Sequence, residues 1–287
     1  GQYEKIKDEL YAYVWGMWDH IKNGGEHGAK YYDLVWVGSL PGMRESRRLT
    51  GDYLLTENDI LKNKIFNDAV AYGGPHGLLD FDRLPSEVYS FKGAYTLPWR
   101  SYYSVNISNL VMAGRDISVT RLGLGSARIM GTCAVGGQAV GTAISLCKKY
   151  KALPRELSAH IGELQQLISE DDGYIPGVVN RDKDDIARLC KPVASSRKEG
   201  FEEINLVNGT SRAEENASNA WRSDGISPQG EKVTFRFGEV KEVSRVQITF
   251  DSGFGYPIKI TLSDNRRKQQ REGVPEELVK AFTVRLL

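Results

Sequence analysis

The residues with the clearest chemical potential stand in one stretch, AGRDISVTRLGLGSARIMGTCAVGGQAVG, residues 113–141. Asp116 follows closely after the apolar run 110–112, and small residues, glycine above all, crowd the positions beyond it. Small residues lower helix stability and raise the entropic cost of folding, so their crowding indicates a backbone that must lie very close to something. That neighbour is either another element of the protein or a ligand.

The order of elements predicted here is typical of a site for a dinucleotide cofactor: a buried strand, then a glycine, an acidic residue and a helix. Asp116 can accept hydrogen bonds from sugar hydroxyls. A helix beginning near Ser126 would offer unpaired amides and a positive dipole end to a phosphate or an electron-rich ring. The alternative is a glycine-rich helix packed tightly on a sheet without any ligand. Spacing alone leaves both open, because no G-x-G-x-x-G motif follows a strand at the start of a βαβ unit.

Three blocks of the sequence resemble the FAD-dependent oxidoreductase family. NISNLVMAGRDISVTRLGLGSARIMGTCAVGGQAVGTA is similar to its C-terminal flavin-binding segment, LPWRSYYSVNISNL to the run before it, and LPGMRESRRLTGDYLLTENDI to its arginine-rich segment. The similarity covers roughly residues 2–180. It implies FAD as cofactor and hydride transfer from a small-molecule substrate, with a sugar-related compound as the candidate, to the flavin.

The resemblance also implies which residues face the cofactor. Asp116 would contact the ribityl or phosphate region, and the turn and helix start from Gly123 to Met130 would approach the isoalloxazine. The expected cofactor-binding residues are Gly114, Arg115, Asp116, Ser118, Gly123, Gly125, Ser126 and Met130. The family's N-terminal Rossmann half, with its glycine fingerprint for ADP, is missing from this sequence. We therefore expect a fragment that binds FAD weakly or not at all by itself.

Arginines are the candidate catalytic residues. They are Arg44, Arg47, Arg48 and Arg121. Beside a flavin, such side chains could hold a carboxylate or sugar-derived substrate and stabilise negative charge on the reduced ring. The first three could equally form a solvated, salt-bridged face. Relatives commonly carry a histidine where this chain has Arg121, so the resemblance implies no proton-transfer role for this arginine.

The elements expected to position these residues are mostly helical. Spacing predicts an amphipathic helix from Gln2 that ends at residues 23–25, and a helix opened by a Thr56–Asp59 capping box that runs to Tyr72. Further predictions follow along the chain. They are a strand at 31–42, a buried strand at 109–112, a long helix at 126–150 and a helix at 155–170.

A second, all-β domain is expected from about residue 189, which gives domains at 1–188 and 189–287. Four segments alternate apolar and polar residues, as in an antiparallel sheet with one buried face; they are KVTFRFGEV, SRVQITFD, IKITLSD and FTVRLL. The region resembles the first half of a discoidin-like sandwich, a module that often binds carbohydrate. Its few strands suggest a C-terminal truncation. The predicted fold class is thus a mixed α/β (α+β) flavoprotein fragment plus an incomplete β-sandwich.

Composition excludes several classes of partner. The 287 residues carry a net charge of +1, which gives no reason to expect nucleic acid, and no apolar run suggests a membrane-spanning segment. Three cysteines form no metal or disulfide pattern, and the four histidines show no metal-ligand spacing, so no metal is expected. Compartment and oligomeric state stay open.

Two functional hypotheses remain. The first is part of an FAD-dependent oxidoreductase, inactive by itself. The second is a non-catalytic protein that binds carbohydrate or a partner on a degenerate flavoprotein scaffold.

Overall fold

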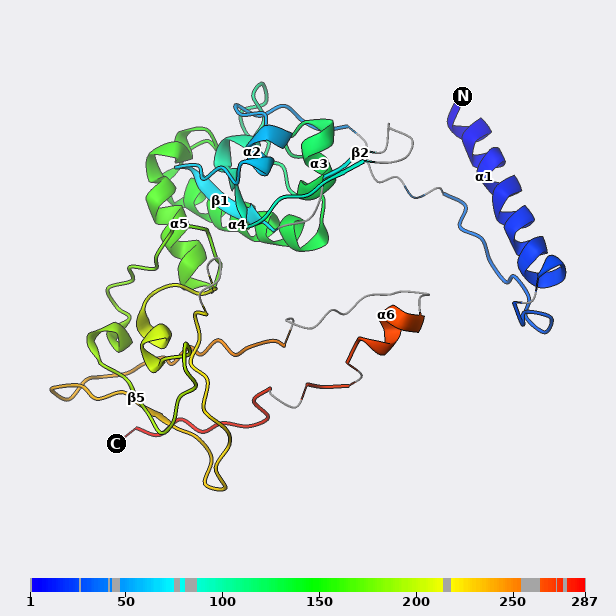
Figure 1. Ribbon diagram of the computed structural model, residues 1–287. Coiled ribbons are helices and arrows are strands. Elements are labelled where there is room, and N and C mark those ends of the chain that lie inside the picture. The colour runs from blue at the N-terminus through cyan, green and yellow to red at the C-terminus, as the bar shows by residue number, and fades with distance from the viewer. Residues whose placement is uncertain are drawn as a thin grey trace.

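A computed structural model gives the arrangement of the chain (Figure 1). It describes residues 2–25, 27–40, 42, 47–74, 78–80, 87–213, 218–253, 264–271, 273–275 and 278–286.

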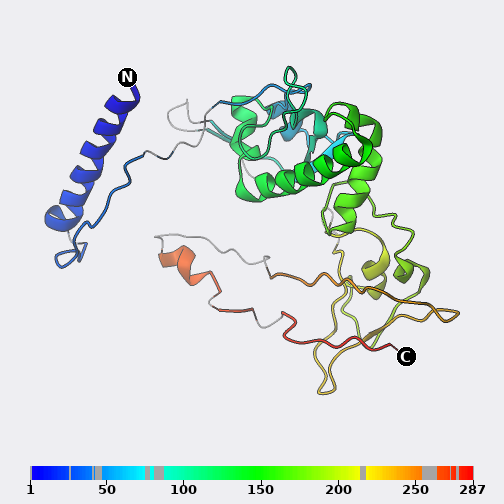
Figure 2. The same ribbon diagram turned by 180° about the vertical axis from the view of Figure 1, so that it is seen from behind.

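The first helix stands apart from the rest of the protein (Figures 1 and 2). Helix α1 (Gln2–Asp19) continues into a single π-helical turn, His20–Gly24, which confirms the predicted helix and its end. None of its residues is buried, and the exposed apolar side chains include Ile6, Tyr13 and Met17. The periodicity therefore predicts the helix correctly, although no element in the described part of the chain buries its apolar face.

The body is built on a two-stranded sheet. Strand β1 (Ala69–Gly73) pairs antiparallel with β4 (Tyr95–Pro98). Helix α4 (Met130–Tyr150) packs on β1, and α5 (Ile161–Glu170) lies against both. Figure 2 shows α4 running along the body from behind. The remaining strand pair of this part is β2 (Leu78–Asp80) with β3 (Glu87–Tyr89).

A single core joins these elements. Its largest fully buried side chains include Trp99, Tyr95 and Tyr102. The indole N–H of Trp99 donates to the carbonyl oxygen of Pro154 at 2.7 Å, so the one polar atom of this buried ring is satisfied. The core thereby extends from the sheet to the segment that leads into α5.

Helix α2 (Glu57–Leu61) opens with the predicted capping box but is much shorter than predicted. Thr56 and Asp59 exchange backbone and side-chain hydrogen bonds as expected. The chain then turns at Asn63, which has a left-handed φ of 48°, and the following residues enter β1 instead of continuing the helix. Pairing with β4 overrides the helical pattern that extended to Tyr72.

The helix predicted for 126–150 is wrong in its start. Two helices occupy this region: α3 (Arg121–Ala127) and α4, with a break at residues 128–129. The helix predicted at 155–170 is a 3₁₀ turn, Glu156–His160, followed by α5, and Leu157, Leu164 and Ile168 are buried.

Neither strand predicted from an apolar run forms as a strand. The described residues of 31–42 form no regular secondary structure, and 109–112 contributes only an isolated bridge between Val111 and Tyr103. An apolar run supplies side chains for a strand, but the strand also needs a neighbour for its backbone groups.

The described part of 189–287 does not show a β-sandwich or jelly roll. It holds one short ladder, β5 (Val193–Ala194) with β6 (Val233–Thr234). In the described alternating segments most apolar side chains are exposed, for example Val246 at 53% and Phe282 at 61%, and Val233 and Phe237 are half-buried. The segment 258–262 lies outside the described residues. Alternation forms a sheet only when a second layer covers the apolar face, and no described element does so here.

Short helices complete the described elements. They are the 3₁₀ turns Trp99–Ser101, Ile186–Leu189 and Glu203–Val207, and the helix α6 (Asp264–Lys268). The result is a mixed α/β structure with few, short strands. Among the described helices, α4 alone is long and apolar enough to cross a bilayer, which the sequence analysis did not anticipate. Its buried residues pack against β1 and α5, as those of a core helix do.

Two adjacent glycines of α4 offer a matched test of this packing. A Cβ on Gly136 would lie 2.5 Å from the Tyr102 hydroxyl and 3.0 Å from its ring, whereas a Cβ on Gly137 would meet nothing within 4 Å. We expect Gly136→Ala to lower the free energy of unfolding by about 1–3 kcal/mol through overpacking. Gly137→Ala should raise it by up to about 1 kcal/mol through helix propensity. Urea unfolding of the two variants measures the difference, and equal effects would contradict the packing described.

The capping box of α2 predicts a pH dependence of stability. Burial of the Asp59 carboxyl favours its neutral form, but hydrogen bonds from Lys64, Thr56 and Tyr53 outweigh burial and lower its pKa. A lowered pKa in the folded state stabilises the fold above the unfolded-state pKa, and this stability is lost as the pH falls through the folded-state value.

We therefore expect Asp59→Asn to be destabilised by about 1–3 kcal/mol at neutral pH, with a difference from the unmodified protein that shrinks below about pH 4. Denaturant unfolding at several pH values measures it. Asp8→Asn, at an exposed position of α1, is the control. If the destabilisation of Asp59→Asn stays the same at low pH, the charge of the Asp59 carboxylate is not its cause.

Candidate functional site

The candidate site begins at the backbone segment from Asp116 to Ser118, at the edge of the core. The Leu49 N–H donates to the carbonyl oxygen of Asp116 at 2.9 Å, and the Ser118 N–H donates to the carbonyl oxygen of Ser101 at 3.0 Å. Ile117, between them, is buried. Neighbouring backbone therefore holds both sides of the segment, and Asp116 lies at its outer end.

The Asp116 carboxylate has an unsatisfied oxygen. The residue is half-buried, and its Oδ1 atom is buried without a hydrogen-bond partner among the described residues. A buried carboxylate oxygen without a donor costs free energy, so such atoms in native proteins are usually satisfied by protein, water or ligand. The carboxylate is thus suited to accept a hydrogen bond from a hydroxyl or N–H group of a bound molecule.

Gly114 turns the chain just before this carboxylate. Its φ is +90°, a value that L side chains rarely adopt, and a Cβ there would meet nothing within 4 Å. Glycine is therefore required by the backbone conformation and not by crowding. Arg115, between the two, has an exposed side chain.

The start of α4 is open. Its N-cap residue is Ile129, and no side chain among the described residues caps the helix. Met130 is 88% exposed, and a Cβ on Gly131 would meet nothing within 4 Å. A helix of 21 residues presents unpaired amides and a partial positive charge at this end, which favour an anion or an electron-rich atom.

The thiol of Cys133, near the start of α4, feels the charges of Arg115 and Asp116. Cys133 lies in the first turns of α4, and burial raises the pKa of its thiol; the charge of Arg115 lowers that pKa and the charge of Asp116 raises it. Both charges therefore lie within electrostatic reach of the α4 N-terminus. The raised pKa keeps the thiol protonated, which agrees with a packed side chain and not a redox group.

Several predicted cofactor-binding residues lie inside α3 instead of at an open helix end. Gly123, Gly125 and Ser126 are all buried. The N–H of Gly123 donates to Thr120 Oγ1 at 3.1 Å. The Tyr95 hydroxyl donates to Ser126 Oγ at 3.0 Å, and burial raises the pKa of Tyr95 to about 12. The structure thus assigns these three residues packing contacts, and any contact with a cofactor stays a prediction.

The N-terminus of α3 is closed by protein. Thr120 caps it and also donates to Glu57 Oε2 at 2.8 Å. Arg121, the first residue of the helix, is exposed. Sequence reasoning missed this closed end and the helix start at Met130; Thr120, three residues before Gly123, was the available signal for an N-cap.

The other arginine candidates differ in position. Arg44 lies outside the described residues. Arg47 is exposed and Arg48 is half-buried, and the structure gives neither an ion pair with any described residue. Because Leu49 pairs with the Asp116 backbone, Arg48 is brought close to the candidate site.

Two grooves lie elsewhere in the described structure. One, of about 500 Å³, follows α1, and the other, of about 300 Å³, is lined in part by Asp68, Arg100 and Ser158. The carboxylate of Asp68 forms a two-point ion pair with Arg100, with distances of 2.8 and 3.0 Å. Neither groove is lined by Asp116.

The buried hydroxyls of Ser118 and Ser101 differ in whether they have a hydrogen-bond partner, and this difference can be tested by stability measurements. The Ser118 side chain is fully buried and its Oγ has no partner among the described residues, whereas Ser101 Oγ donates to the Tyr53 carbonyl oxygen at 3.0 Å. We expect Ser118→Ala to leave the free energy of unfolding unchanged or to raise it, and Ser101→Ala to lower it by about 1 kcal/mol. Thermal unfolding of the two variants distinguishes them; a large loss in Ser118→Ala would show that its hydroxyl has a partner within the protein.

Comparison with known proteins bears on the same residues. The family described as FAD dependent oxidoreductase matches residues 2–168, which include the Asp116 segment and all of α4. No curated protein and no solved structure matches the chain. The family match covers more than half of the sequence, and the chain belongs to the FAD-dependent oxidoreductase family.

Proposed function

We propose that this chain supplies the flavin-facing part of an oxidoreductase that moves a hydride from a small-molecule substrate to FAD. Family membership implies FAD. The single observation that carries the proposal is the buried, unpartnered Oδ1 atom of Asp116, within electrostatic reach of the uncapped start of α4. A carboxylate oxygen without a donor and a helix end without a cap are complementary to a flavin nucleotide, which carries hydroxyl donors and a ring edge with carbonyl and nitrogen acceptors.

The roles of the residues follow from their chemistry. FAD, when bound, supplies the two-electron acceptor. Asp116 would accept a hydrogen bond from a hydroxyl of the ribityl chain, which fixes the orientation of the cofactor. The amides of Met130 and Gly131 would donate to the carbonyl and nitrogen edge of the ring, where the helix dipole stabilises negative charge.

The rigidity of α4 supports this arrangement. Its buried face packs against β1 and α5, and Gly136 allows close contact with Tyr102. A donor group that is fixed before the reaction costs no reorganisation when charge develops. The break at residues 128–129, which ends α3 and starts α4, is what exposes these amides.

Two arginines lie at the edge of the candidate site and bear on the substrate class. Arg48 lies beside the Asp116 segment and Arg47 is exposed next to it. Guanidinium groups bind carboxylates through paired hydrogen bonds, so an anionic or acidic sugar-derived substrate suits this edge of the site. Arg44 and Arg121 remain candidates for the same role.

Asp116→Asn tests the proposal. The amide keeps the shape of the side chain but replaces one acceptor oxygen with a donor group. In a protein that joins this chain to an ADP-binding half, we expect FAD affinity to fall at least tenfold, which corresponds to about 1.4 kcal/mol. Titration followed by flavin fluorescence measures this loss.

Two further measurements make the result specific. Asp224→Asn, at an exposed position of the C-terminal part, should leave FAD affinity unchanged. The cofactor-free Asp116→Asn protein should unfold at the same or a higher temperature, because a buried unsatisfied carboxylate is removed. Unchanged FAD affinity in Asp116→Asn would refute the assigned role of the carboxylate.

A further inference from the structure

Two histidines meet at the C-terminal end of α1. The Nε2 atoms of His20 and His27 lie 3.1 Å apart, and the ring centroids are 5.0 Å apart with the rings at 70° to each other. The separation of seven residues matches no metal-ligand spacing in the sequence, so the sequence analysis assigned these side chains no shared role. The turn that follows α1 is what brings them together.

The backbone around this pair is built to let the rings meet. His20 begins the π-helical turn His20–Gly24, a conformation that is rare and often found at functional sites. The next residue, Gly25, is extended, with φ −141° and ψ 166°, which any residue can adopt. A Cβ on Gly25 would nevertheless lie 2.6 and 2.7 Å from two atoms of the His27 ring and 3.4 Å from His20 Cε1. Glycine here provides space for the two imidazoles.

Contacts on both sides of the turn hold it in place. Lys22 donates to the carbonyl oxygen of Tyr32 at 2.9 Å and forms an ion pair with Asp33, so the returning chain is fastened to the end of α1. Asn23 donates to Asp19 Oδ1 at 2.9 Å across the same turn.

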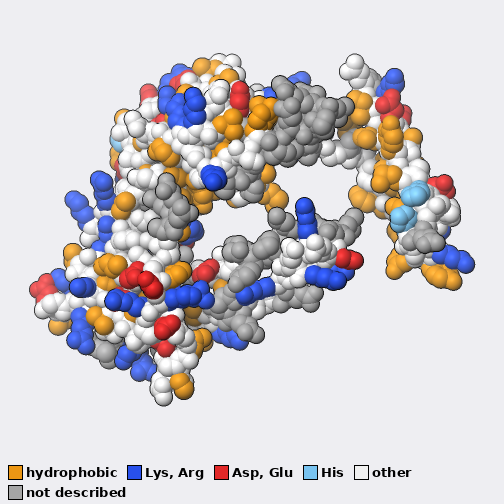
Figure 3. Space-filling view, viewed as in Figure 1, with side chains coloured by type: hydrophobic (Ala, Val, Ile, Leu, Met, Phe, Trp, Pro, Cys, Tyr) orange, Lys and Arg blue, Asp and Glu red, His pale blue; other side chains and the backbone are white. Residues whose placement is uncertain are grey.

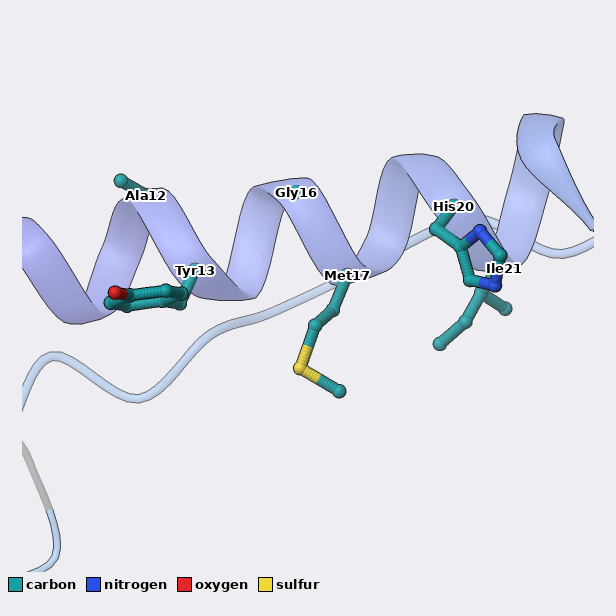
Figure 4. Close-up of a pocket in the computed structure, with 6 residues that line it drawn as sticks. All are labelled: Ala12, Tyr13, Gly16, Met17, His20 and Ile21. Atoms are coloured by element: carbon teal, nitrogen blue, oxygen red, sulfur yellow. The ribbon is translucent and has the colours of Figure 1, made fainter.

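The histidine pair is accessible. Both residues are exposed, and Figure 3 shows histidine surface at this end of α1. His20 also ends the groove of about 500 Å³ along α1, where Figure 4 places it beyond Tyr13 and Met17. An ion from solution, with its remaining ligands, can reach both ring nitrogens.

We propose that His20 and His27 bind one transition-metal dication of the zinc, copper or nickel type through their Nε2 atoms. Two metal–nitrogen bonds of about 2.0–2.1 Å and a nitrogen separation of 3.1 Å enclose an angle of about 100° at the metal, between square-planar and tetrahedral values. Imidazole suits these three metals, whereas calcium and magnesium need oxygen ligands.

The proposed site is incomplete within one chain. The described residues hold no group of three or more histidine, cysteine, aspartate or glutamate side chains that could bind a metal. Water or an exchangeable ligand must therefore fill the other positions, which makes the site a binding site with open coordination and not a closed structural one.

Calorimetric titration of the full chain with ZnCl₂ and, separately, with NiCl₂ tests the proposal. We expect one ion per chain. His20→Ala and His27→Ala should each weaken binding at least tenfold. His160→Ala, which removes a histidine stacked on Tyr150 and far along the chain, should leave it unchanged.

A pair of glycine variants separates this site from ordinary binding by surface histidines. Gly25→Ala keeps both histidines but places a methyl group against the His27 ring, so we expect it to weaken binding at least tenfold. Gly16→Ala, where a Cβ meets nothing within 4 Å, should bind as the unmodified chain does. Circular dichroism confirms that α1 is retained in each variant.

Three results would overturn the proposal. They are no binding up to about 1 mM metal, affinity unchanged by His27→Ala, and equal affinity of Gly25→Ala and Gly16→Ala. In the first case the two rings form only a hydrogen bond with each other.

Discussion

The extended segment from Asp116 to Thr120 is the constraint on which the candidate site depends. On one side it receives hydrogen bonds from the Leu49 and Leu55 amides, and on the other its Ser118 amide donates to Ser101. The Thr120 N–H then donates to the Leu55 carbonyl oxygen at 2.8 Å and leads directly into α3. Because these backbone groups are satisfied within the protein, the segment is held firmly, whereas the Oδ1 atom of Asp116 has no hydrogen-bond partner among the described residues.

Glycines allow close packing both around the Asp116–Thr120 segment and between α4 and the core. A Cβ on Gly51 would collide with the carbonyl oxygen of Arg100, so glycine lets the strand-like segments approach each other. Gly136 does the same between α4 and Tyr102. The small residues that were expected to admit a ligand therefore have two separate uses: some bring backbones together in the core, and others, such as Gly131, leave the start of α4 open.

The N-terminal helix and the C-terminal part of the described chain leave most of their apolar side chains exposed. The apolar side chains of α1, and those of the alternating segments in 189–287, are largely exposed. A helix can form from local hydrogen bonds alone, so α1 keeps its predicted course without a buried face. Strands need a partner for each backbone group, and the C-terminal alternation yields only the short β5–β6 ladder in the described residues.

The sequence by itself determined the features that depend on neighbouring residues. These include the extent of α1, the Thr56–Asp59 capping box, the amphipathic face of α5 and the membership that the motif order implied. Tertiary structure decided which apolar runs became strands, where α2 stopped and where the glycine-rich helix began. It also decided that His20 faces His27. Local patterns specify hydrogen bonds within a few residues, whereas strand partners, helix breaks and ring contacts depend on segments that only folding brings together.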